Sequence, residues 1–492
     1  MNRLLLLLCL AGLSACTSPT TASGPISSPA ANQPESSEDA ALKQELERVL
    51  KQLEPGIQAH TTASALTLEH ARQLAENPAD TNFRIQQDHY DPLPPSALSQ
   101  RLLREGVYAS DNLVSAFLSD GDAAQIVRRF REQVEPAIGR TPFTHYGLAV
   151  VQRGRVWFVS LVLLTEIVSL EPLALTYTSP TEVPVKGRIT KAGYSAPQLL
   201  MTLPSGEVVD IPAQVQGNAF EARLPLTQTG LYSFEVDVQG PLGPLPACNF
   251  VLAVGRDYPA PASTASRAAE AIDDLAQARE NLLALVNADR RSMNLSQLNL
   301  DPALSQAAQS HSEDMVQNGF LGHNSPTHGT PQQQAARFGV SDLVAQNISV
   351  SRSLANAQQE LMSSPAHRRT LLDPSHTHAG FGVQPGPDGF LYVTQKFVQR
   401  QLIVDPLPAS IRQGETLNIS GERLSTPGYV AVFINNDVQG EPVDLTQNQR
   451  FSIPVTLRQT GPVRLRIGFS PPPENNVFNF SFYNIWDLDV QP

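Results

Sequence analysis

One motif occurs twice in this chain, at a long and constant spacing. Residues 220–230 read FEARLPLTQTG and residues 451–461 read FSIPVTLRQTG, and short alternating apolar segments precede each copy. Alternation of apolar and polar residues, in short runs separated by turns, is typical of a small antiparallel β-sandwich. The repeat therefore predicts two β-sandwich modules, which we expect to be Ig-like in architecture, at residues 169–256 and 401–492.

The regions ahead of the two sandwiches also correspond to each other. Residues 145–147 (HYG) match residues 378–380 (HAG), and residues 104–107 (REGV) match residues 337–340 (RFGV). The order of modules is therefore α/β, all-β, α/β, all-β, and we expect the pair to be tandemly duplicated. A run rich in proline and alanine predicts a linker between the halves, at residues 257–269.

Length and charge limit the classes of protein to consider. A chain of 492 residues is too long for one hydrophobic core and predicts about three or four domains. The hydrophobic set makes up 41% and charged residues 17%, which suits globular domains. A net charge of -12 disfavours binding to a phosphate backbone, so no nucleic-acid partner is expected.

The N-terminus has the form of an export signal. Arg3 is followed by an apolar run at residues 4–10 that is too short to span a bilayer. Residues 13–16 (LSAC) resemble the lipobox of bacterial lipoproteins, in which Cys16 would carry the lipid and become the new N-terminus. A signal peptide with a chance cysteine is the alternative. We expect a cell-envelope protein that is anchored to a membrane by lipid, with a lipoprotein signal peptide and lipobox at residues 1–16 and a flexible tether at residues 17–40.

Cysteine usage agrees with export of a chain that is stabilised by packing alone. Cys9 lies in the segment that would be removed, and Cys16 would be lipidated. Cys248 is then the single remaining cysteine, so the exported domains are expected to contain no intramolecular disulfide bond.

From residue 268 the hydrophobic pattern becomes helical. The apolar face of the first helix consists of Leu275, Ala278, Leu282, Leu285 and Val286. Asp301-Pro302 and Thr330-Pro331 each place a capping residue before a proline, so a helix is expected to begin at each pair. A fourth helix is expected at residues 355–362, and two short strands at 380–383 and 390–397. Helices that flank a small sheet predict an α/β sandwich.

The motifs of this region resemble, in order and spacing, the bacterial SCP-like (CAP) domains. They are LVN and Arg290 at residues 285–290, DM at 314–315, GHNSP at 322–326, TP at 330–331, QNI at 346–348, SPAHR at 364–368, GFGV at 380–383 and QKF at 395–397. The resemblance covers about residues 270–400. It implies an α-β-α sandwich with a surface cavity that is lined by two histidines and by acids.

The carried-over cavity differs from the family pattern. The two histidines correspond to His323 and His367, but the acid expected just before the asparagine corresponds to Gln346. A second acid is also missing, and Leu361 stands where a tryptophan is usual. The resemblance therefore implies a cavity of His323, Gln346 and His367 that has lost its acids.

The histidine pair is also a candidate metal site. Two neutral imidazoles can bind Zn²⁺, but a site of high affinity usually adds a third histidine, a thiolate or a carboxylate. Gln346 offers only a neutral carbonyl oxygen. His376 and His378 could add a ligand, although two histidines at a strand edge are more often solvated. The one cofactor to consider is thus Zn²⁺ or another divalent cation, held by His323 and His367.

Hydrolysis would need a nucleophile that is held by a base. Ser364 and His367 lie three residues apart, but no third group that would orient the histidine can be identified. Ser364 is instead expected to cap the turn that begins at Pro365. His311, on the apolar face of its helix, is expected to be a core histidine. The sequence therefore favours a binding module over an enzyme.

Residues 41–168 are interpreted as a degenerate CAP-like domain. The expected correspondences are His89 with His323, Asp111-Asn112 with Gln346-Asn347, and the vicinity of Arg131 to Val134 with Ser364 to His367. Because the last of these segments has no histidine, we expect the fold to persist there without the chemistry of the cavity.

Three hypotheses follow. The first is a non-catalytic envelope protein that binds an unknown ligand or protein partner in the second CAP cavity. The second is a metal-assisted hydrolase that acts on peptide or cell-wall material. The third is an envelope scaffold with no ligand.

Overall fold

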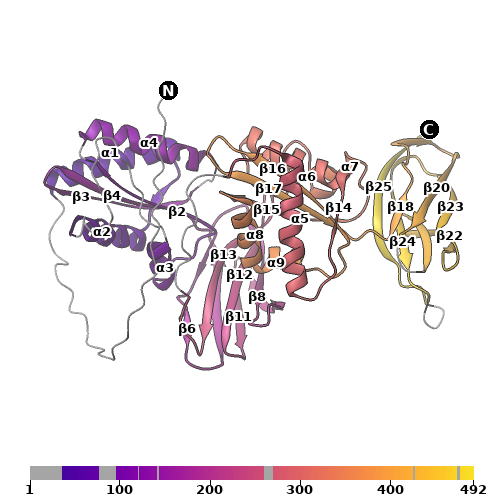
Figure 1. Ribbon diagram of the computed structural model, residues 1–492, viewed down its shortest axis with the longest axis horizontal. Helices are drawn as coiled ribbons and strands as arrows, with labels where there is room; N and C mark the ends of the chain where they lie inside the picture. Colours follow the sequence, from indigo (N-terminus) through magenta and orange to yellow (C-terminus); the bar gives the residue numbers. More distant parts are fainter. Residues whose placement is uncertain are drawn as a thin grey trace.

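The computed structural model describes residues 36–76, 96–119, 121–140, 143–259, 270–424, 427–473 and 477–492. The predicted signal peptide with Cys16, most of the predicted tether, and His89 lie outside the described residues. We call the four parts the N-terminal α/β domain (residues 36–165), sandwich 1 (168–254), the C-terminal α/β domain (275–398) and sandwich 2 (402–491). Figure 1 shows sandwich 2 at one end of the molecule and sandwich 1 at its centre.

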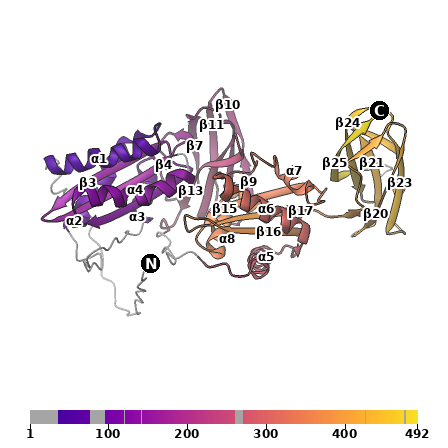
Figure 2. The same ribbon diagram turned by 90° about the horizontal axis from the view of Figure 1, so that it is seen from above.

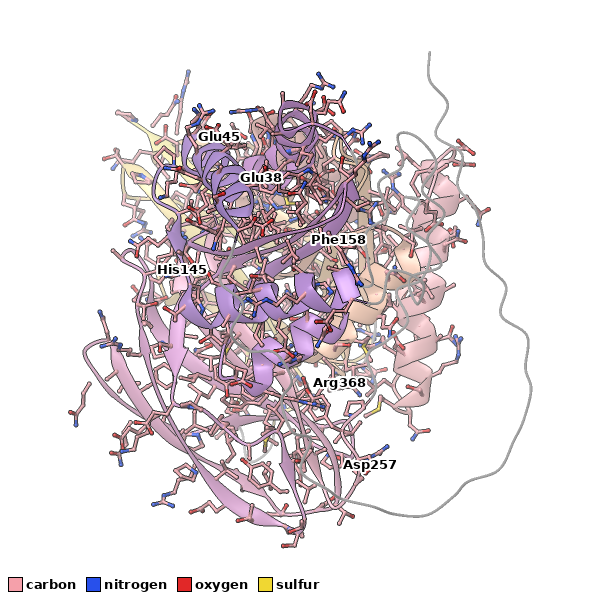
Figure 3. The ribbon with its side chains drawn as sticks, turned by 90° about the vertical axis from the view of Figure 1, so that its left-hand side faces the viewer. Glu38, Glu45, His145, Phe158, Asp257 and Arg368 are labelled. Carbon is pink, nitrogen blue, oxygen red and sulfur yellow. The ribbon has the colours of Figure 1, made fainter. Side chains whose placement is uncertain are left out.

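The N-terminal α/β domain is a four-stranded sheet between two layers of helices. Its strands lie in the order β1 (Gln58–Ala59), β3 (His145–Arg153), β4 (Val156–Thr165) and β2 (Asp111–Ser119). The helices α1 (Ser37–Leu53) and α4 (Ala123–Arg140) share a core with one face of the sheet, and α2 (Thr61–Glu76) and α3 (Ser96–Arg104) share a core with the other. Figure 3 shows this layering from the side, with Glu38 and Glu45 on α1 above the sheet strand that carries Phe158.

The C-terminal α/β domain has the same layers and the same strand connectivity. Its strands lie in the order β14 (Asn299–Leu300), β16 (His378–Pro385), β17 (Leu391–Val398) and β15 (Val344–Ser351). One face packs on α5 (Leu275–Ser292), α8 (Leu354–Ser363) and α9 (Pro365–Leu371), and the other on α6 (Pro302–Asn318) and α7 (Pro331–Ala336). The α-β-α sandwich predicted for this region is present.

The sequence punctuation places the helices of this domain correctly. The side chain of Asp301 accepts a hydrogen bond from Leu304 N at 2.7 Å, and Thr330 forms a capping box with Gln333. Leu275 is an error in the predicted apolar face, because it is the first residue of α5 and 38% of its surface is exposed. The strand β15 and the separate helix α9 were not predicted.

Two glycines allow α6 to lie directly on the sheet. A Cβ atom at Gly380 would overlap the backbone of Leu304, and one at Gly382 would overlap the backbone of Ala308. Since no other residue lacks a Cβ, this close approach of helix and strand requires the two glycines of the motif GFGV at residues 380–383.

Each sandwich region consists of two sheets that share one hydrophobic core. In sandwich 1, one sheet has the strand order β10 (Ala213–Gln216), β11 (Ala219–Leu226), β7 (Thr181–Ile189) and β5 (Val168–Leu170). The other sheet has the order β6 (Thr176–Tyr177), β13 (Gly243–Val254), β12 (Gly230–Gly240), β8 (Ser195–Thr202) and β9 (Val208–Ile211). In sandwich 2, the smaller sheet has the strand order β18 (Leu402–Val404), β20 (Thr416–Arg423) and β23 (Arg450–Thr456). The larger sheet has the order β19 (Ser410–Arg412), β25 (Ser481–Gln491), β24 (Gly461–Ser470), β21 (Tyr429–Ile434) and β22 (Asp437–Asp444). The strands of both regions fall where the repeat predicts β structure.

Sandwich 1 packs against both α/β domains. Tyr108 of the N-terminal domain belongs to the core of sandwich 1, and its hydroxyl accepts a hydrogen bond from Leu173 N at 3.0 Å. On the other side, α9 of the C-terminal α/β domain lies against β8, β9 and β12. Figure 2 shows sandwich 1 between the two α/β domains, with sandwich 2 beyond the second of them. Among the described helices, none is long and apolar enough to cross a bilayer.

Candidate ligand-binding site

His323 and His367 face each other from two separate segments. His323 lies in the loop between α6 and α7, and His367 lies in the first turn of α9, whose N-cap is Ser364. The centroids of their rings are 6.4 Å apart, with 34° between the ring planes. Asn347 of β15 holds the second histidine in place, because its Nδ2 donates to the backbone oxygen of His367 at 3.0 Å.

Both imidazoles are neutral at pH 7. Part of each ring remains open to a cavity, but protein surrounds the other sides. This burial, together with the positive charges that His367, His311 and Lys396 would carry, lowers the pKa of His323 to about 3. Burial alone lowers the pKa of His367 to about 4. Neither ring therefore brings a positive charge to the site.

Gln346 connects His323 to a buried lysine. Lys396 of β17 is fully buried, and its Nζ donates to Oε1 of Gln334 at 2.9 Å and to Oε1 of Gln346. The Nε2 of Gln346 then lies 3.3 Å from Nδ1 of His323 and 3.4 Å from the backbone oxygen of His323. Since a carbonyl oxygen can only accept, the amide nitrogen must be the atom on the His323 side.

This arrangement fixes the tautomer of His323. Its Nδ1 accepts a hydrogen bond from Gln346, so the single proton of the neutral ring is on Nε2. A carboxylate at position 346 would do the opposite, because it would accept from Nδ1–H and leave a lone pair on Nε2. The glutamine thus makes His323 a hydrogen-bond donor at the atom where a metal ligand needs a lone pair.

The donor set does not fit a zinc ion. In the part of the chain that the structure describes, no three side chains of His, Cys, Asp or Glu are close enough together to hold a metal. The pair offers two imidazoles, and one of them has its Nε2 protonated. His376 and His378 do not complete a site, because neither lines the cavity.

The cavity lies between two domains. It has a volume of about 230 Å³ and is lined from the C-terminal α/β domain by His323, Asn324, Pro331, Gln346, Asn347, Ala366, His367 and Thr370. The opposite wall belongs to sandwich 1 and consists of Asp237, Pro244, Leu245 and Pro246. The three cavity residues carried over from the resemblance therefore do lie together, but the second wall was not foreseen.

A continuous interface holds that second wall in position. The backbone N–H of Asn324 donates to the oxygen of Leu242 at 2.8 Å, and a Cβ atom at Gly322 would overlap Leu242. Glu235 of β12 is fully buried, and it accepts from the N–H of Ala366 at 2.9 Å. These contacts join the sandwich to the loop of His323 and to the helix of His367.

Comparison with known proteins identifies the domain. A model of the cysteine-rich secretory protein family, CAP, matches residues 283–397. The C-terminal α/β domain is a CAP domain. Two curated proteins of Bacillus subtilis (strain 168) are similar to this chain: the uncharacterized protein YkwD, 31% identical over 126 residues, and the uncharacterized membrane protein YlbC, 30% identical over 123 residues. Each match covers 25% of this chain, and the two cover 49% and 34% of the respective relatives.

Solved structures are also similar to parts of the chain. An extracellular protein containing an SCP domain from Bacillus anthracis is 16% identical, covers 65% of this chain and 99% of its own, and has a TM-score of 0.24. An outer surface protein from Borrelia burgdorferi is 19% identical, covers 26% of this chain and 96% of its own, and has a TM-score of 0.25.

The remaining candidate residues of the CAP domain have structural roles. Ser364 caps α9, and its hydroxyl accepts from the backbone N–H of His367 at 3.4 Å and makes no bond to the imidazole of His367. His376 donates from Nδ1 to the oxygen of Thr370 at 3.1 Å and stacks on Phe397. His311 is buried, as expected, and its Nε2 donates to the oxygen of Gly322 at 3.0 Å. Its Nδ1 has no partner among the described residues.

One predicted correspondence with the N-terminal domain is wrong. Gln346 is paired with Lys396, two residues before the end of β17, whereas Asp111 is paired with Thr165 at the end of β4. The register places Val114, not Asp111, at the position of Gln346, because Val114 pairs with Val162 as Gln346 pairs with Lys396. The segment 131–134 lies within α4 and has no histidine, as predicted.

Sequence reasoning missed Glu235 and Asp237 as site residues. They alternate along β12 with Phe234 and Val236, which face the core of sandwich 1, so the two acids occupy the face that an alternating pattern assigns to solvent. The only sequence signal is that the two acids lie on the same face of the strand. Acids are common on the solvent-facing side of a sheet, so this signal does not indicate a binding site. Only the packing of a second domain makes them buried.

Proposed function

We propose that this chain is a lipid-anchored protein of the cell envelope whose CAP domain binds a ligand without catalysing a reaction. The observation that carries the proposal is the hydrogen-bond chain from Lys396 through Gln346 to His323. It presents a neutral N–H donor to the cavity in place of the lone pair or the titratable carboxylate that catalysis would use. The site is therefore built for hydrogen bonding.

The export and anchoring part of the proposal rests on the N-terminal sequence. The basic start, the short apolar run and the lipobox with Cys16 support a lipoprotein signal peptide, and residues 17–40 support a flexible tether. The curated relative YlbC is named a membrane protein, which is consistent with a location at a membrane. The chain's membrane partner is then the lipid bilayer, and its ligand is a component of the envelope.

We also propose that the chain arose by tandem duplication of a CAP-like domain with an Ig-like sandwich. Both α/β domains have the same strand order, and in both a threonine hydroxyl lies 2.9 Å from Nδ1 of the next histidine, in Thr144-His145 and in Thr377-His378. The residue that caps the helix after the first, short strand of each domain differs: His60 caps α2, which follows β1, and Asp301 caps α6, which follows β14. The shared backbone with changed side chains supports a duplicated fold whose first copy has lost the cavity chemistry.

A metal titration tests the non-catalytic assignment. We expect Zn²⁺ to leave the thermal unfolding midpoint of the full chain unchanged, and to raise that of the Gln346→Glu variant, because a carboxylate there frees Nε2 of His323 for a metal. A ligand at a hundred times its dissociation constant stabilises by about 2.7 kcal/mol, which is easily measured. The double variant with His323→Ala and His367→Ala is the control. A midpoint that Zn²⁺ raises in the wild type and not in this control would instead establish a metal site and favour the metal-assisted hydrolase.

Membrane fractionation tests the anchor. The wild type is expected in the membrane fraction and the Cys16→Ser variant in the soluble exported fraction, because the variant has no thiol to acylate. Recovery of the variant in the membrane fraction would contradict lipid anchoring through Cys16.

A further inference from the structure

The face of sandwich 1 that covers the CAP domain carries two acids in different states. Glu235 is fully engaged, because its carboxylate accepts from Ala366 N at 2.9 Å and from Nδ2 of Asn249 at 2.9 Å, and it also bonds to Ser364. Asp237 is also buried, with 8% of its surface exposed. Among the described residues, its only side-chain hydrogen bond joins it to Glu235.

One oxygen of Asp237 is left without a partner. Oδ1 is buried and forms no hydrogen bond within the described residues, although the residue lines the cavity. Burying a polar atom without a partner is unfavourable, and native proteins keep such atoms where a ligand, a water molecule or a functional need accounts for them. Burial and the adjacent Glu235 charge raise the pKa of Asp237 to about 8, so the group is protonated for most of the time at pH 7.

The opposite wall of the cavity has matching groups. Oδ1 of Asn347 is likewise buried with no partner in the described part of the chain, and Nε2–H of His323 is a donor. No Lys or Arg is among the described residues that line the cavity, and the two histidines are neutral. Three prolines and Leu245 add apolar surface to the lining. The lining therefore offers hydrogen bonds without a full charge to neutralise an ion.

The size of the cavity limits the ligand further. Its volume of about 230 Å³ is smaller than the roughly 300–1,000 Å³ of pockets that enclose drug-sized molecules. A single sugar ring, or one end of a longer chain, is of the appropriate size.

We propose that the ligand site is a composite of the CAP domain and sandwich 1, in which Asp237 binds an uncharged ligand that bears hydroxyl or amide groups, of the size of one N-acetylated sugar ring. The inference rests on the proposed binding function and deepens it. It assigns the ligand class to the whole cavity, and it assigns sandwich 1 a direct part in recognition.

Three sugars that differ in charge test the ligand class. We would record ligand-observed saturation-transfer NMR with the full chain and N-acetylglucosamine, glucosamine or glucuronate, which are uncharged, cationic and anionic. Only N-acetylglucosamine is expected to bind. Preferential binding of either charged sugar would overturn the uncharged class, and absence of binding by all three would overturn the assignment to a single sugar ring.

Two substitutions at one position test the role of Asp237. Asp237→Leu is expected to weaken N-acetylglucosamine binding at least about tenfold, because it removes the acceptor, and each lost tenfold corresponds to about 1.4 kcal/mol. Asp237→Asn is expected to retain binding, since its amide nitrogen can donate to Glu235 while its Oδ1 remains an acceptor. Asp210→Asn is the matched control, because Asp210 is at the same interface, paired with Arg369, but does not line the cavity. The unfolding midpoint of each variant shows whether it is folded.

The outcomes separate this inference from the proposed function. Binding that is lost in His323→Leu but unchanged in Asp237→Leu would leave the CAP cavity as the site and overturn the composite. Equal losses in Asp237→Leu and Asp237→Asn, with both variants folded, would also overturn the assigned role of Oδ1. The metal titration detects a failure of the proposed function separately. In that case Zn²⁺ would raise the unfolding midpoint of the wild type but not that of the variant without His323 and His367.

Discussion

The two sandwiches share a motif and the strand order of their larger sheet, but the outer face of that sheet is buried in one and exposed in the other. Counted from the glycines that begin β12 and β24, Gly230 and Gly461, the position of Glu235 corresponds to Arg466. In sandwich 1 this face carries buried acids beneath the CAP domain. In sandwich 2 it carries Arg464, which forms a 3.0 Å ion pair with Asp487 while more than half of both side chains is exposed.

The difference shows what an alternating pattern determines. Alternation places every second side chain in the core of the sandwich, and both copies obey it. It does not determine what covers the other side. Sandwich 1 became one wall of a cavity because a second domain packs on it, and its outward acids were thereby taken out of water.

The largest effect should come from separating sandwich 1 from the CAP domain. Gly322→Ala introduces a Cβ atom that overlaps Leu242, and we expect a loss of about 3 kcal/mol in the free energy of unfolding together with loss of ligand binding. Gly139→Ala is the matched control, because no atom lies within 4 Å of a Cβ atom there. Chemical denaturation of the two variants measures the difference. Equal free energies of unfolding would contradict the prediction, because they would show that the interface accommodates the added methyl group.

A smaller effect is expected from truncating the buried acid. Glu235→Ala removes the acceptor of the Ala366 N–H and one of the two acceptors of the Asn249 amide nitrogen, which should cost about 2 kcal/mol. Arg464→Ala on the corresponding face of sandwich 2 removes only an exposed ion pair and should cost less than about 1 kcal/mol. Denaturation curves of both variants compare the two faces directly; a costlier Arg464→Ala would reverse the comparison.

The stability contributed by the buried face of sandwich 1 should also depend on pH. The pKa of Asp237 is raised to about 8 from an ordinary 3.8, first by burial and then by Glu235, so the folded state holds a proton that the unfolded state releases. Its contribution to stability is therefore present at low pH and is lost as pH rises towards 8. We expect Asp237→Asn to gain stability over the wild type by on the order of 1 kcal/mol per pH unit between pH 6.5 and 8.

Lys396 and the two cavity histidines also make stability depend on pH. Burial lowers the pKa of Lys396 to about 7, so its folded form loses a proton first and stability rises with pH through this group. The lowered pKa values of His323 and His367 reduce stability only as pH falls below about 6.5. The wild type and Asp237→Asn share these groups, so the difference between their unfolding free energies reports the buried pair of Asp237 and Glu235, each of which affects the protonation of the other. A constant difference across the window would refute the prediction.

The smallest effect is expected at the rim of the interface. The ion pair of Arg369 and Asp210 is 2.9 Å long, but 42% and 76% of the two side chains are exposed. Asp210→Asn should therefore change stability by less than about 1 kcal/mol, and the change should vanish in high salt. Denaturation at low and at high ionic strength checks this, and a large effect independent of salt would place the pair among the buried contacts.

The sequence predicts much of the CAP domain because its signals are local. Asp301 and Thr330 mark helix starts within three residues of the N–H groups that they cap. The pair of glycines around Phe381 marks the contact of strand and helix. The error at Asp111 arose where local motifs were weak and only the strand register could align the two domains.

The sequence by itself determined the modules, their order, and the cavity set of His323, Gln346 and His367. The modules and their order follow from short-range periodicity, caps and a repeated motif, and the cavity set is what the resemblance to CAP domains implies. All of these signals lie in short stretches of the chain. The tertiary structure alone decided that Lys396 orients Gln346, that Gln346 fixes the proton of His323, and that Asp237 faces the same cavity from another domain. Such contacts join residues far apart in sequence, and the packing of one buried surface on another selects them, which no local pattern encodes.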